Sequence, residues 1–295
     1  MKIHTCQIEK QNDTLSNLKI RKKSMELTIM TDSLDRKLQI AMSPMKGKRV
    51  LVAFSGGVDS SVLASLAKEA AGQVLLLTVN SPTVPDVEKE TAAKVAKELG
   101  IEHESVEVDW LGNEELAENP INRCYLCKKQ LAQIWKIFAN QRGLDIVVEG
   151  SNVSETQGYR PGEAALKEEG ILSPFLDAKM TKDEIRQYAR EKHLSVAELP
   201  SMACLATRFP YGSKITQEKL DMVERMECAI AEVFGVRTVR ARYHGDIVRI
   251  EVGESELEKI FDKERLERID TIGKSIGFRY VTFDAKGYRT GSMDI

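Results

Sequence analysis

The sequence of 295 residues lacks any apolar run of the ~20 residues that a membrane-spanning helix needs, and no signal peptide is visible. It also lacks a strong excess of charge of one sign. The formal net charge is −2, so no broad basic field is present to attract a nucleic acid. These absences favour a cytoplasmic protein whose partners are small molecules rather than membranes or nucleic acids.

Cysteine is scarce in this chain. The five cysteines, at positions 6, 124, 127, 204 and 228, are too few and too irregularly spaced for the disulfide framework of a secreted protein. In a reducing compartment, a C-x-x-C pair such as Cys124 and Cys127 instead indicates metal or redox chemistry.

Two common nucleotide-binding motifs are missing, namely the Lys-Ser/Thr ending of a Walker A loop and the Rossmann pattern G-x-G-x-x-G. What is present is the apolar run 50–54 followed directly by Ser-Gly-Gly-Val-Asp-Ser-Ser at 55–61 and then by apolar residues at helical spacing. Glycines let backbone N–H groups approach an anion, and a helix start adds unpaired N–H groups and partial positive charge. The segment predicts a phosphate site, with an ordinary strand-to-helix turn as the alternative.

The same seven residues resemble the PP-loop of the ATP pyrophosphatases, which transfer AMP to a substrate and release pyrophosphate. The resemblance implies ATP and Mg²⁺ as cofactors. It assigns ATP binding to Ser55, Gly56, Gly57, Asp59, Ser60 and Ser61. Asp59 is expected to orient the loop or to hold Mg²⁺, and its alternative role is to cap the helix.

An alternation of strands and helices surrounds this loop. We expect strands at 49–54, 73–79, 101–108 and 145–149, with a shorter strand near 171–175. We expect helices at 59–70, 86–99, 126–141 and 181–192. Unbroken apolar strands suit a parallel sheet covered on both faces, so the prediction is a doubly wound α/β fold of the PP-loop, adenine nucleotide alpha hydrolase-like type. Its ligands should lie at the carboxyl ends of the strands, where the strand order reverses.

Three domain-level segments are expected. Residues 1–34 are polar and read as a disordered N-terminal extension, and 35–212 form the PP-loop domain. Residues 213–295 form a small α+β domain for substrate contact or homo-oligomerisation. Its expected elements are a helix at 216–234, strands at 236–243 and 246–252, a helix at 263–276 and a strand at 278–284.

The second chemical feature is the C-x-x-C pair together with Cys204, which lies far away in the sequence. Two thiolates on one turn suit Zn or an iron–sulfur cluster. A structural Zn site would want a fourth ligand, and no companion C-x-x-C or His pair at ligand spacing exists. Three cysteines fit a cubane in which one iron has no protein thiolate. A redox dithiol and unrelated thiols remain as alternatives.

Four motifs, in order, resemble the LarE family, and the resemblance covers roughly residues 35–295. They are Asn-Arg-Cys-Tyr-Leu-Cys-Lys at 122–128, Gly-Tyr-Arg-Pro-Gly at 158–162, Ala-Cys-Leu-Ala-Thr-Arg-Phe-Pro-Tyr-Gly at 203–212 and Gly-Tyr-Arg-Thr-Gly-Ser at 287–292. LarE-type enzymes are ATP-dependent sulfur transferases that help to build the nickel-pincer nucleotide cofactor of lactate racemase. They adenylylate a carboxylate of pyridinium-3,5-biscarboxylic acid mononucleotide and convert it to a thiocarboxylate.

The resemblance also implies how sulfur is delivered. Some LarE members take sulfur from a single sacrificial cysteine, and others hold a 4Fe–4S cluster on three cysteines and deliver sulfur from its open iron. This sequence resembles the second kind, with Cys124, Cys127 and Cys204 as the metal ligands and with Cys204 and Asp59 as catalytic residues. Sacrificial transfer from Cys204 is the alternative.

Six further residues are expected to contact the substrate or a second metal. Planar guanidinium groups bind phosphate well, which assigns the substrate phosphate to Arg160, Arg208, Arg240 and Arg242. Glu227 interrupts the apolar stripe of the 216–234 helix, and with Glu251 it is a candidate for a second metal or carboxylate site. Ordinary surface or strand positions are the alternative.

Three other functions compete with this assignment. A PP-loop tRNA thiolase also combines adenylylation with cysteines, but it would need a tRNA-binding surface, against which the net charge argues. An amide-forming enzyme such as an NAD synthetase would have no use for three cysteines. A non-catalytic iron–sulfur or nucleotide-sensing protein would release no pyrophosphate.

Overall fold

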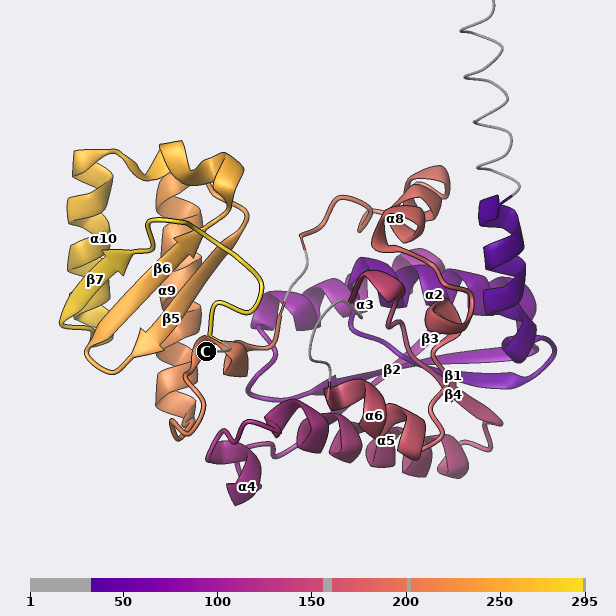
Figure 1. Ribbon diagram of the computed structural model, residues 1–295. Coiled ribbons are helices and arrows are strands. Elements are labelled where there is room, and N and C mark those ends of the chain that lie inside the picture. The colour runs from indigo at the N-terminus through magenta and orange to yellow at the C-terminus, as the bar shows by residue number, and fades with distance from the viewer. Residues whose placement is uncertain (1–32, 156–160, 201–202, 294–295) are drawn as a thin grey trace, which may run out of the picture.

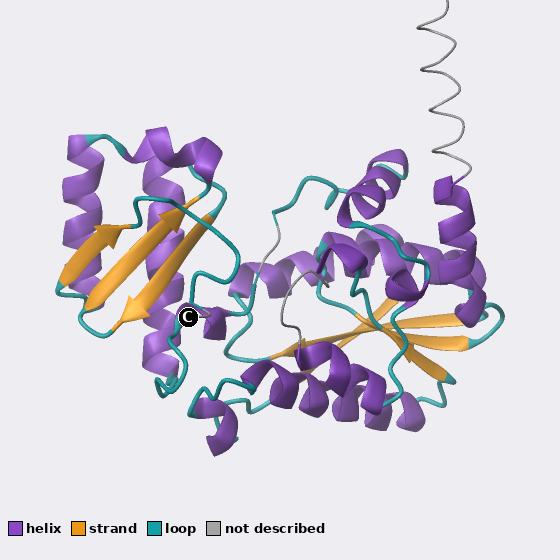
Figure 2. Ribbon diagram, in the orientation of Figure 1, coloured by secondary structure: helices purple, strands orange, loops and turns teal. Residues whose placement is uncertain are grey.

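The computed structural model describes residues 33–155, 161–200 and 203–293. It contains two β-sheets, each with its own helices (Figure 1). The first core, which contains Val50 and Val52, lies on one face of the first sheet, and a smaller core lies on its other face. The second core belongs to the second sheet. The helices and strands of the two units stand side by side and are joined by loops (Figure 2).

The first sheet has four parallel strands in the order β3-β2-β1-β4. Their bounds are β1 Arg49–Ala53, β2 Gln73–Asn80, β3 Glu102–Glu107 and β4 Ile146–Val148. The chain adds β2 and β3 on one side of β1 and then crosses to place β4 on the other side. The strand order therefore reverses between β1 and β4, and the PP-loop follows β1 at this point.

Helices cover both faces of this sheet, as Figure 1 shows. One face carries α2 (Val58–Ala70), α3 (Asp86–Leu99) and α8 (Lys182–Glu191), and the other carries α5 (Arg123–Gln141) and α6 (Pro161–Glu168). Alternate residues of β1 enter opposite cores: Val50 and Val52 pack in one, Leu51 and Ala53 in the other. Burial on both faces explains the unbroken apolar strands, and the predicted α/β class is confirmed.

Two expectations differ from the structure. The short strand near 171–175 is reduced to one bridge between Val148 and Leu172, because Pro174 has no N–H to donate and begins the helical turn α7 (Pro174–Asp177). A helix at 33–42 begins inside the predicted extension, and its Leu34 is only 3% exposed and packs in the first core. Residues 1–32 lie outside the described part of the chain.

The second sheet has three strands in the order β5-β6-β7, with β5 and β6 antiparallel and β6 and β7 parallel. Two helices pack against it, and the predicted α+β arrangement is confirmed. The elements are α9 Gln217–Phe234, β5 Val239–His244, β6 Ile247–Val252, α10 Lys263–Ile276 and β7 Tyr280–Phe283. The remaining short elements are α4 Glu114–Ala117 and the 3-10 turns Ser43–Met45, Val153–Glu155, Leu205–Arg208 and Glu254–Ile260.

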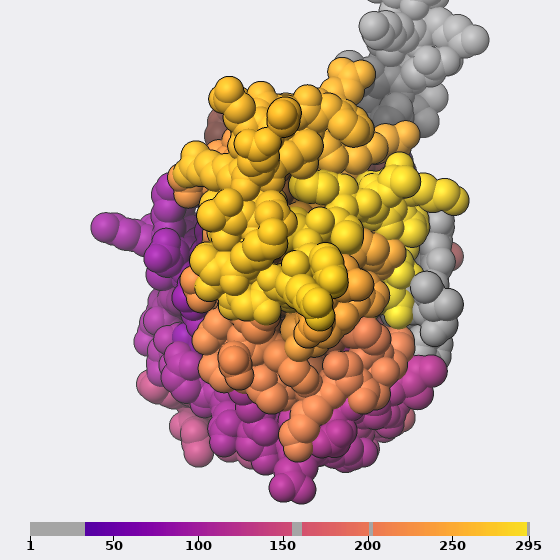
Figure 3. Space-filling view, turned by 90° about the vertical axis from the view of Figure 1, so that its left-hand side faces the viewer, coloured from indigo at the N-terminus to yellow at the C-terminus, as the bar shows by residue number. Residues whose placement is uncertain are grey.

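The segment that carries Cys204 packs with the second unit rather than the first. Leu205, Ala206 and Phe209 belong to the second core, as does Trp110 from the loop after β3. Figure 3 shows this side of the molecule, where orange and yellow residues of the second unit cover the top and middle of the surface and purple and magenta residues of the first unit lie to the left and below. Within the described residues, no helix has both the length and the apolar character for a membrane span.

Candidate active site

The PP-loop joins the end of β1 to α2, and two serine side chains hold its shape. Ser55 Oγ accepts a hydrogen bond from the Gly57 N–H at 3.3 Å and lies 3.1 Å from Ser60 Oγ. Ser60 Oγ also donates to the Gly57 carbonyl oxygen at 3.2 Å. These hydrogen bonds fold the loop locally, while the first N–H groups of α2 have no partner within the helix and remain available to an anion.

The two glycines of the loop differ in backbone conformation and in the space that a side chain would have. Gly56 has a φ of +74°, and a Cβ there would lie 2.5 Å from Ala92 Cα, so α3 packs directly against the loop backbone. Gly57 has an ordinary φ of −74° and is the N-cap of α2. A Cβ at Gly57 would meet only Ser55 Oγ, at 3.4 Å, among the described residues. The Cβ side of Gly57 is therefore open.

Asp59 lies in the first turn of α2, two residues after Gly57. Its carboxylate pairs with Lys182 at the start of α8 and accepts a hydrogen bond from Asn152 Nδ2 at 3.3 Å. Gly150, which follows β4, packs so closely that a Cβ there would lie 3.1 Å from the Asp59 carbonyl carbon. The loops that follow β1 and β4 thus meet at Asp59, at the point where the strand order reverses.

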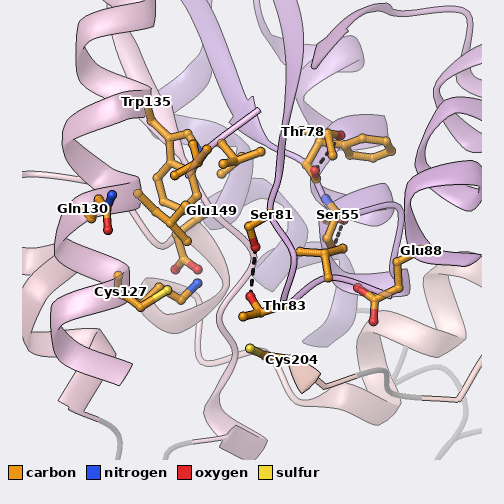
Figure 4. A pocket seen from close by; sticks show the side chains of 18 of the residues that line it. Ser55, Thr78, Ser81, Thr83, Glu88, Cys127, Gln130, Trp135, Glu149 and Cys204 are labelled. Carbon is orange, nitrogen blue, oxygen red and sulfur yellow. Dashed lines mark hydrogen bonds between the residues drawn. The ribbon is translucent and has the colours of Figure 1, made fainter. Parts of the chain in front are cut away.

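A cavity of about 430 Å³ opens beside the loop, large enough for a small-molecule ligand. It brings together the PP-loop and all three predicted sulfur ligands. Its lining includes Ser55, Asp59, Ser60, Cys124, Cys127 and Cys204. Figure 4 shows Cys127, Gln130 and Trp135 on one side, Ser55 and Glu88 on the other, and Cys204 below. Ser61 is fully buried, and neither it nor the two loop glycines line the cavity.

The expected helix at 126–141 would begin between the two cysteines of the C-x-x-C pair, but both cysteines lie within the helix. The helix α5 begins at Arg123, so Cys124 and Cys127 are in its first turns, and residues three apart on a helix lie on the same side. Burial and the nearby Cys204 raise the pKa of Cys127, and a hydrogen bond from Trp110 Nε1 at 3.4 Å partly opposes them, so that the pKa is about 11. Cys127 is therefore a protonated thiol at neutral pH.

The exposed Cys204 sits at the start of a 3-10 turn that buried arginines hold in place. Arg208 Nη1 donates to the carbonyl oxygens of Ala203 at 2.7 Å and of Cys204 at 3.2 Å. Arg242 Nη1 donates to the Thr207 carbonyl oxygen at 3.0 Å. The backbone on both sides of the thiol is therefore anchored by side chains whose own positions are fixed in the second unit.

Both of those arginines are already paired with carboxylates. Arg208 makes two hydrogen bonds to Glu227, at 2.8 and 2.9 Å, and Glu227 also accepts from the Ala241 N–H at 2.8 Å. Arg242 makes two hydrogen bonds to Glu251, at 3.0 and 2.7 Å, and both side chains are buried. These four predicted phosphate and metal residues therefore hold one another, and none of them lines the cavity.

The other two predicted phosphate ligands are Arg240 and Arg160. Arg240 stacks over the Tyr288 ring at 5.1 Å, and burial together with the neighbouring Arg208 lowers its pKa. Arg160 lies outside the described residues. A phosphate role for either residue stays a prediction.

The three cysteines match an iron–sulfur cluster in type, and they share one cavity as free thiols. They do not converge, however: across residues 33–155, 161–200 and 203–293, no three His, Cys, Asp or Glu side chains are close enough to hold a metal ion. Cys124 and Cys127 lie at the start of α5 and Cys204 lies on a separate turn, so gathering them would require movement of the Cys204 segment or of the start of α5. The cluster is therefore a proposal about the loaded protein.

Comparison with known proteins identifies the family. The chain is 36% identical over 247 residues to an uncharacterized protein of Synechocystis, covering 83% of this chain and 92% of the relative. It is 32% identical over 251 residues to the pyridinium-3,5-bisthiocarboxylic acid mononucleotide synthase of Lactiplantibacillus plantarum, covering 84% of this chain and 89% of the relative. The chain belongs to the LarE family. It is accordingly an enzyme, a sulfur transferase.

Weaker similarities connect this LarE member to the wider group of PP-loop proteins. The family model of the queuosine biosynthesis protein QueC matches residues 49–123, which run from β1 to the start of α5. A tRNA-specific 2-thiouridylase of Thermoanaerobacter is 27% identical over 258 residues, covering 71% of this chain and 68% of the relative. Of these two relatives, the thiouridylase has a name that indicates sulfur chemistry.

Sequence reasoning missed three charged residues in or near the cavity. Lys182 pairs with Asp59, and Glu149 lines the cavity while accepting hydrogen bonds from Ser151. Glu149 could have been found, because it follows the apolar strand β4 just as the PP-loop follows β1. Glu88 also lines the cavity, but in the sequence it is one acidic residue of an amphipathic helix and carries no signal.

Proposed function

We propose that this protein activates a carboxylate of pyridinium-3,5-biscarboxylic acid mononucleotide with ATP and replaces the carboxylate oxygen with sulfur. The observation that carries the proposal is the single cavity lined by both the PP-loop and three cysteines. The PP-loop wall suits a nucleoside triphosphate, and the cysteine wall suits a sulfur donor. An acyl-adenylate formed at the first wall could therefore meet a sulfur nucleophile at the second. The relative from Lactiplantibacillus plantarum carries the name of the corresponding product.

Activation comes first because a carboxylate has no good leaving group. The substrate carboxylate attacks the α-phosphorus of ATP, a C–O–P linkage forms, and pyrophosphate departs. Backbone N–H groups at the start of α2 and the Lys182 side chain would stabilise the charge that develops on the pyrophosphate. Asp59 would hold Mg²⁺ there, since a carboxylate oxygen is a ligand that Mg²⁺ prefers. Its present pairing with Lys182 would then loosen.

Sulfur transfer follows at the cysteine wall. Cys124, Cys127 and Cys204 would hold a 4Fe–4S cluster, which when bound supplies an iron without a protein ligand that can carry the sulfur to be delivered. The chain itself contributes the exposed position of Cys204, which Arg208 and Arg242 hold by its neighbouring carbonyl groups. Sacrificial donation by Cys204 is the second candidate, and the exposure of that thiol is what favours it.

The decisive experiment uses protein purified and reconstituted without oxygen. Iron and sulfide are analysed, and pyrophosphate and thiocarboxylate are measured separately with Mg²⁺-ATP and the mononucleotide. If the cluster is correct, serine at position 124, 127 or 204 removes iron and sulfur transfer alike and leaves pyrophosphate release intact. Cys228→Ser is the matched control, because this exposed thiol lies outside the cavity.

Two outcomes would contradict parts of this function. The cluster would be contradicted by an iron-free protein that transfers one sulfur per chain and whose Cys204 peptide loses the mass of one hydrogen sulfide. That result would establish sacrificial donation by Cys204. Absence of pyrophosphate release with the mononucleotide, but release with a tRNA, would instead favour a thiolase.

A further inference from the structure

One carboxyl group of the cavity has no part in the chemistry described so far. Glu88 lies in the first turn of α3, and that turn is fixed at both ends. Glu224 of α9 accepts a hydrogen bond from the Asp86 N–H at 2.8 Å, and one turn further on, Ala92 packs against the Gly56 backbone. Glu88 is therefore held between the second unit and the PP-loop, and Figure 4 shows it on the Ser55 side of the cavity.

The position of Glu88 also ties it to the cysteine wall. The Leu205 N–H, next to Cys204, donates to the Thr83 carbonyl oxygen at 2.8 Å, and Thr83 belongs to the short loop that leads from β2 into α3. The loop that precedes α3 and Glu88 is thus hydrogen bonded to the segment that carries Cys204. Figure 4 shows Thr83 between Ser81 and Cys204.

The carboxyl group itself is unsatisfied. Glu88 Oε1 is buried and accepts no hydrogen bond from any described residue, which is unusual for a buried polar atom. The charged groups that face it are Arg208, Arg240 and Glu224, from three different elements. The pKa of Glu88 is raised to about 7, mainly by burial and in smaller part by Glu224, against the opposing effect of the two arginines. The group can therefore exchange a proton near neutral pH.

The two half-reactions differ in their need for such a group. Adenylylation joins a carboxylate to AMP and releases pyrophosphate, and no proton leaves the substrate. Sulfur transfer from a hydrosulfide forms a C–S bond, breaks the bond between the acyl carbon and the AMP oxygen, and releases one proton. A carboxylate that accepts a proton is thus needed only in the second half-reaction, sulfur transfer.

We propose that Glu88 is the general base of the sulfur-transfer step and accepts the proton that the attacking S–H group loses. The electron pair of the S–H bond forms the new C–S bond, and the electron pair of the acyl C–O bond leaves with AMP. The proton moves to Glu88 Oε1 and later returns to water, so Glu88 is regenerated. This inference rests on the proposed function and adds a residue to it.

The test separates the two half-reactions in single-turnover experiments with anaerobically reconstituted protein, Mg²⁺-ATP, the mononucleotide and sodium sulfide from pH 5.5 to 8.5. Glu88→Gln removes the base and nearly preserves the shape, and Glu88→Asp retains a carboxylate. Glu90→Gln, on the exposed side of the same helix, is the matched control. Because sulfide itself titrates in this range, the informative quantity is the ratio of wild-type to variant rates at each pH.

We expect pyrophosphate release by Glu88→Gln to stay within about twofold of wild type. Thiocarboxylate formation should fall by about 100-fold at pH 8.5, the usual contribution of a general base. The ratio should shrink toward one below pH 6, where Glu88 of the wild type is protonated, and Glu88→Asp should recover part of the rate.

Three results would overturn the assignment. A rate ratio that does not change with pH would mean that Glu88 only shapes the cavity. Equal losses of pyrophosphate release and thiocarboxylate would make it part of the ATP and Mg²⁺ site. Wild-type thiocarboxylate formation matched by the variant at every pH would remove Glu88 from the chemistry. If wild-type protein releases no pyrophosphate at all, the proposed function itself fails, which is a distinct outcome.

Discussion

The two walls of the cavity are built in opposite ways. The PP-loop wall comes from one segment of seven residues, 55–61, whose serine hydroxyls hold the loop and whose Ser55, Asp59 and Ser60 line the cavity. The cysteine wall is made by α5 and a distant 3-10 turn, and buried ion pairs of the second unit hold that turn. A local site depends on the space around one loop, whereas an assembled site depends on contacts far from the chemistry. Substitutions should therefore affect the two half-reactions separately.

The largest effect is expected from breaking the pair that anchors the Cys204 turn. Glu227→Ala leaves the Arg208 guanidinium, which is 2% exposed, without its carboxylate. Removing one partner of a buried ion pair costs about 3–5 kcal/mol of unfolding free energy. Urea denaturation measures this loss, and the surviving folded protein should release pyrophosphate while its sulfur transfer falls. The matched control is Glu232→Ala, whose carboxylate makes only an exposed contact with Arg268.

The same experiment tests the alternative hypothesis that Arg208 binds phosphate. If Arg208 instead serves as a phosphate ligand that Glu227 merely shields, Glu227→Ala would tighten substrate binding and lower KM. A lower KM with unchanged stability would thus reverse our view of the cysteine wall.

A second prediction tests the local wall. Gly57→Val should reduce pyrophosphate release by about 100-fold or more, comparable to the loss of one preorganised hydrogen-bond donor, because the side chain enters the space left for phosphate. The fold should survive, since Gly57 has an ordinary φ and a Cβ there meets only Ser55 Oγ. Gly57→Ala is the graded control and should lose less. A folded Gly57→Val protein with full pyrophosphate release would refute the phosphate assignment.

A third prediction concerns the carboxyl group that lies between the walls. Because the folded-state pKa of Glu88, about 7, exceeds its ordinary value of 4.5, the folded state binds more protons between those values. Stability from this group is present below pH 4.5 and is lost as pH rises to about 7. Glu88→Gln should therefore match wild type near pH 4 and be more stable at pH 8, by up to about 3 kcal/mol. Thermal unfolding at both pH values measures the difference, and equal stability at pH 8 would contradict it.

The smallest expected effect compares thiols on one wall. With a pKa of about 11, Cys127 should react with iodoacetamide at pH 8 roughly 100-fold more slowly than a thiol of ordinary pKa near 9. Mass spectrometry of the alkylated peptides gives the rates, and Cys127 labelling should increase steeply toward pH 11. Trp110→Phe removes the hydrogen bond to the sulfur and should slow Cys127 further. Rapid labelling of Cys127 at pH 8 would show that the start of α5 opens.

Much of the first wall could be read from sequence because its determinants are neighbours in the chain. The apolar run at 50–54 requires burial on both faces, and the glycine at 56 requires both a positive φ and a close approach by α3. The expected helix boundaries near the C-x-x-C were less accurate, since α5 begins three residues before the predicted start. The strand near 171–175 failed because one proline removed a hydrogen-bond donor.

The second wall shows where sequence reasoning stopped. Arginines and glutamates at 208, 227, 242 and 251 carry the same chemistry whether they bind phosphate, hold a metal or pair with one another. The packing of α9 against the Cys204 turn places Glu227 within hydrogen-bond distance of Arg208, and the pairing of β5 with β6 places Glu251 within that distance of Arg242. The unpaired oxygen of Glu88 is likewise a result of burial between three elements rather than of any local pattern.

The sequence by itself determined the parallel sheet, the position of the phosphate loop and the set of cysteines, because periodicity and contiguous motifs are short-range properties of a chain. The tertiary structure alone decided which charges neutralise one another, which carboxyl group stays unpaired and which thiols face the loop. Those outcomes depend on distances and desolvation between different elements of the fold, some of them more than a hundred residues apart, as in the pairing of Asp59 with Lys182. Electrostatic energies change steeply with both quantities, and neither is encoded locally.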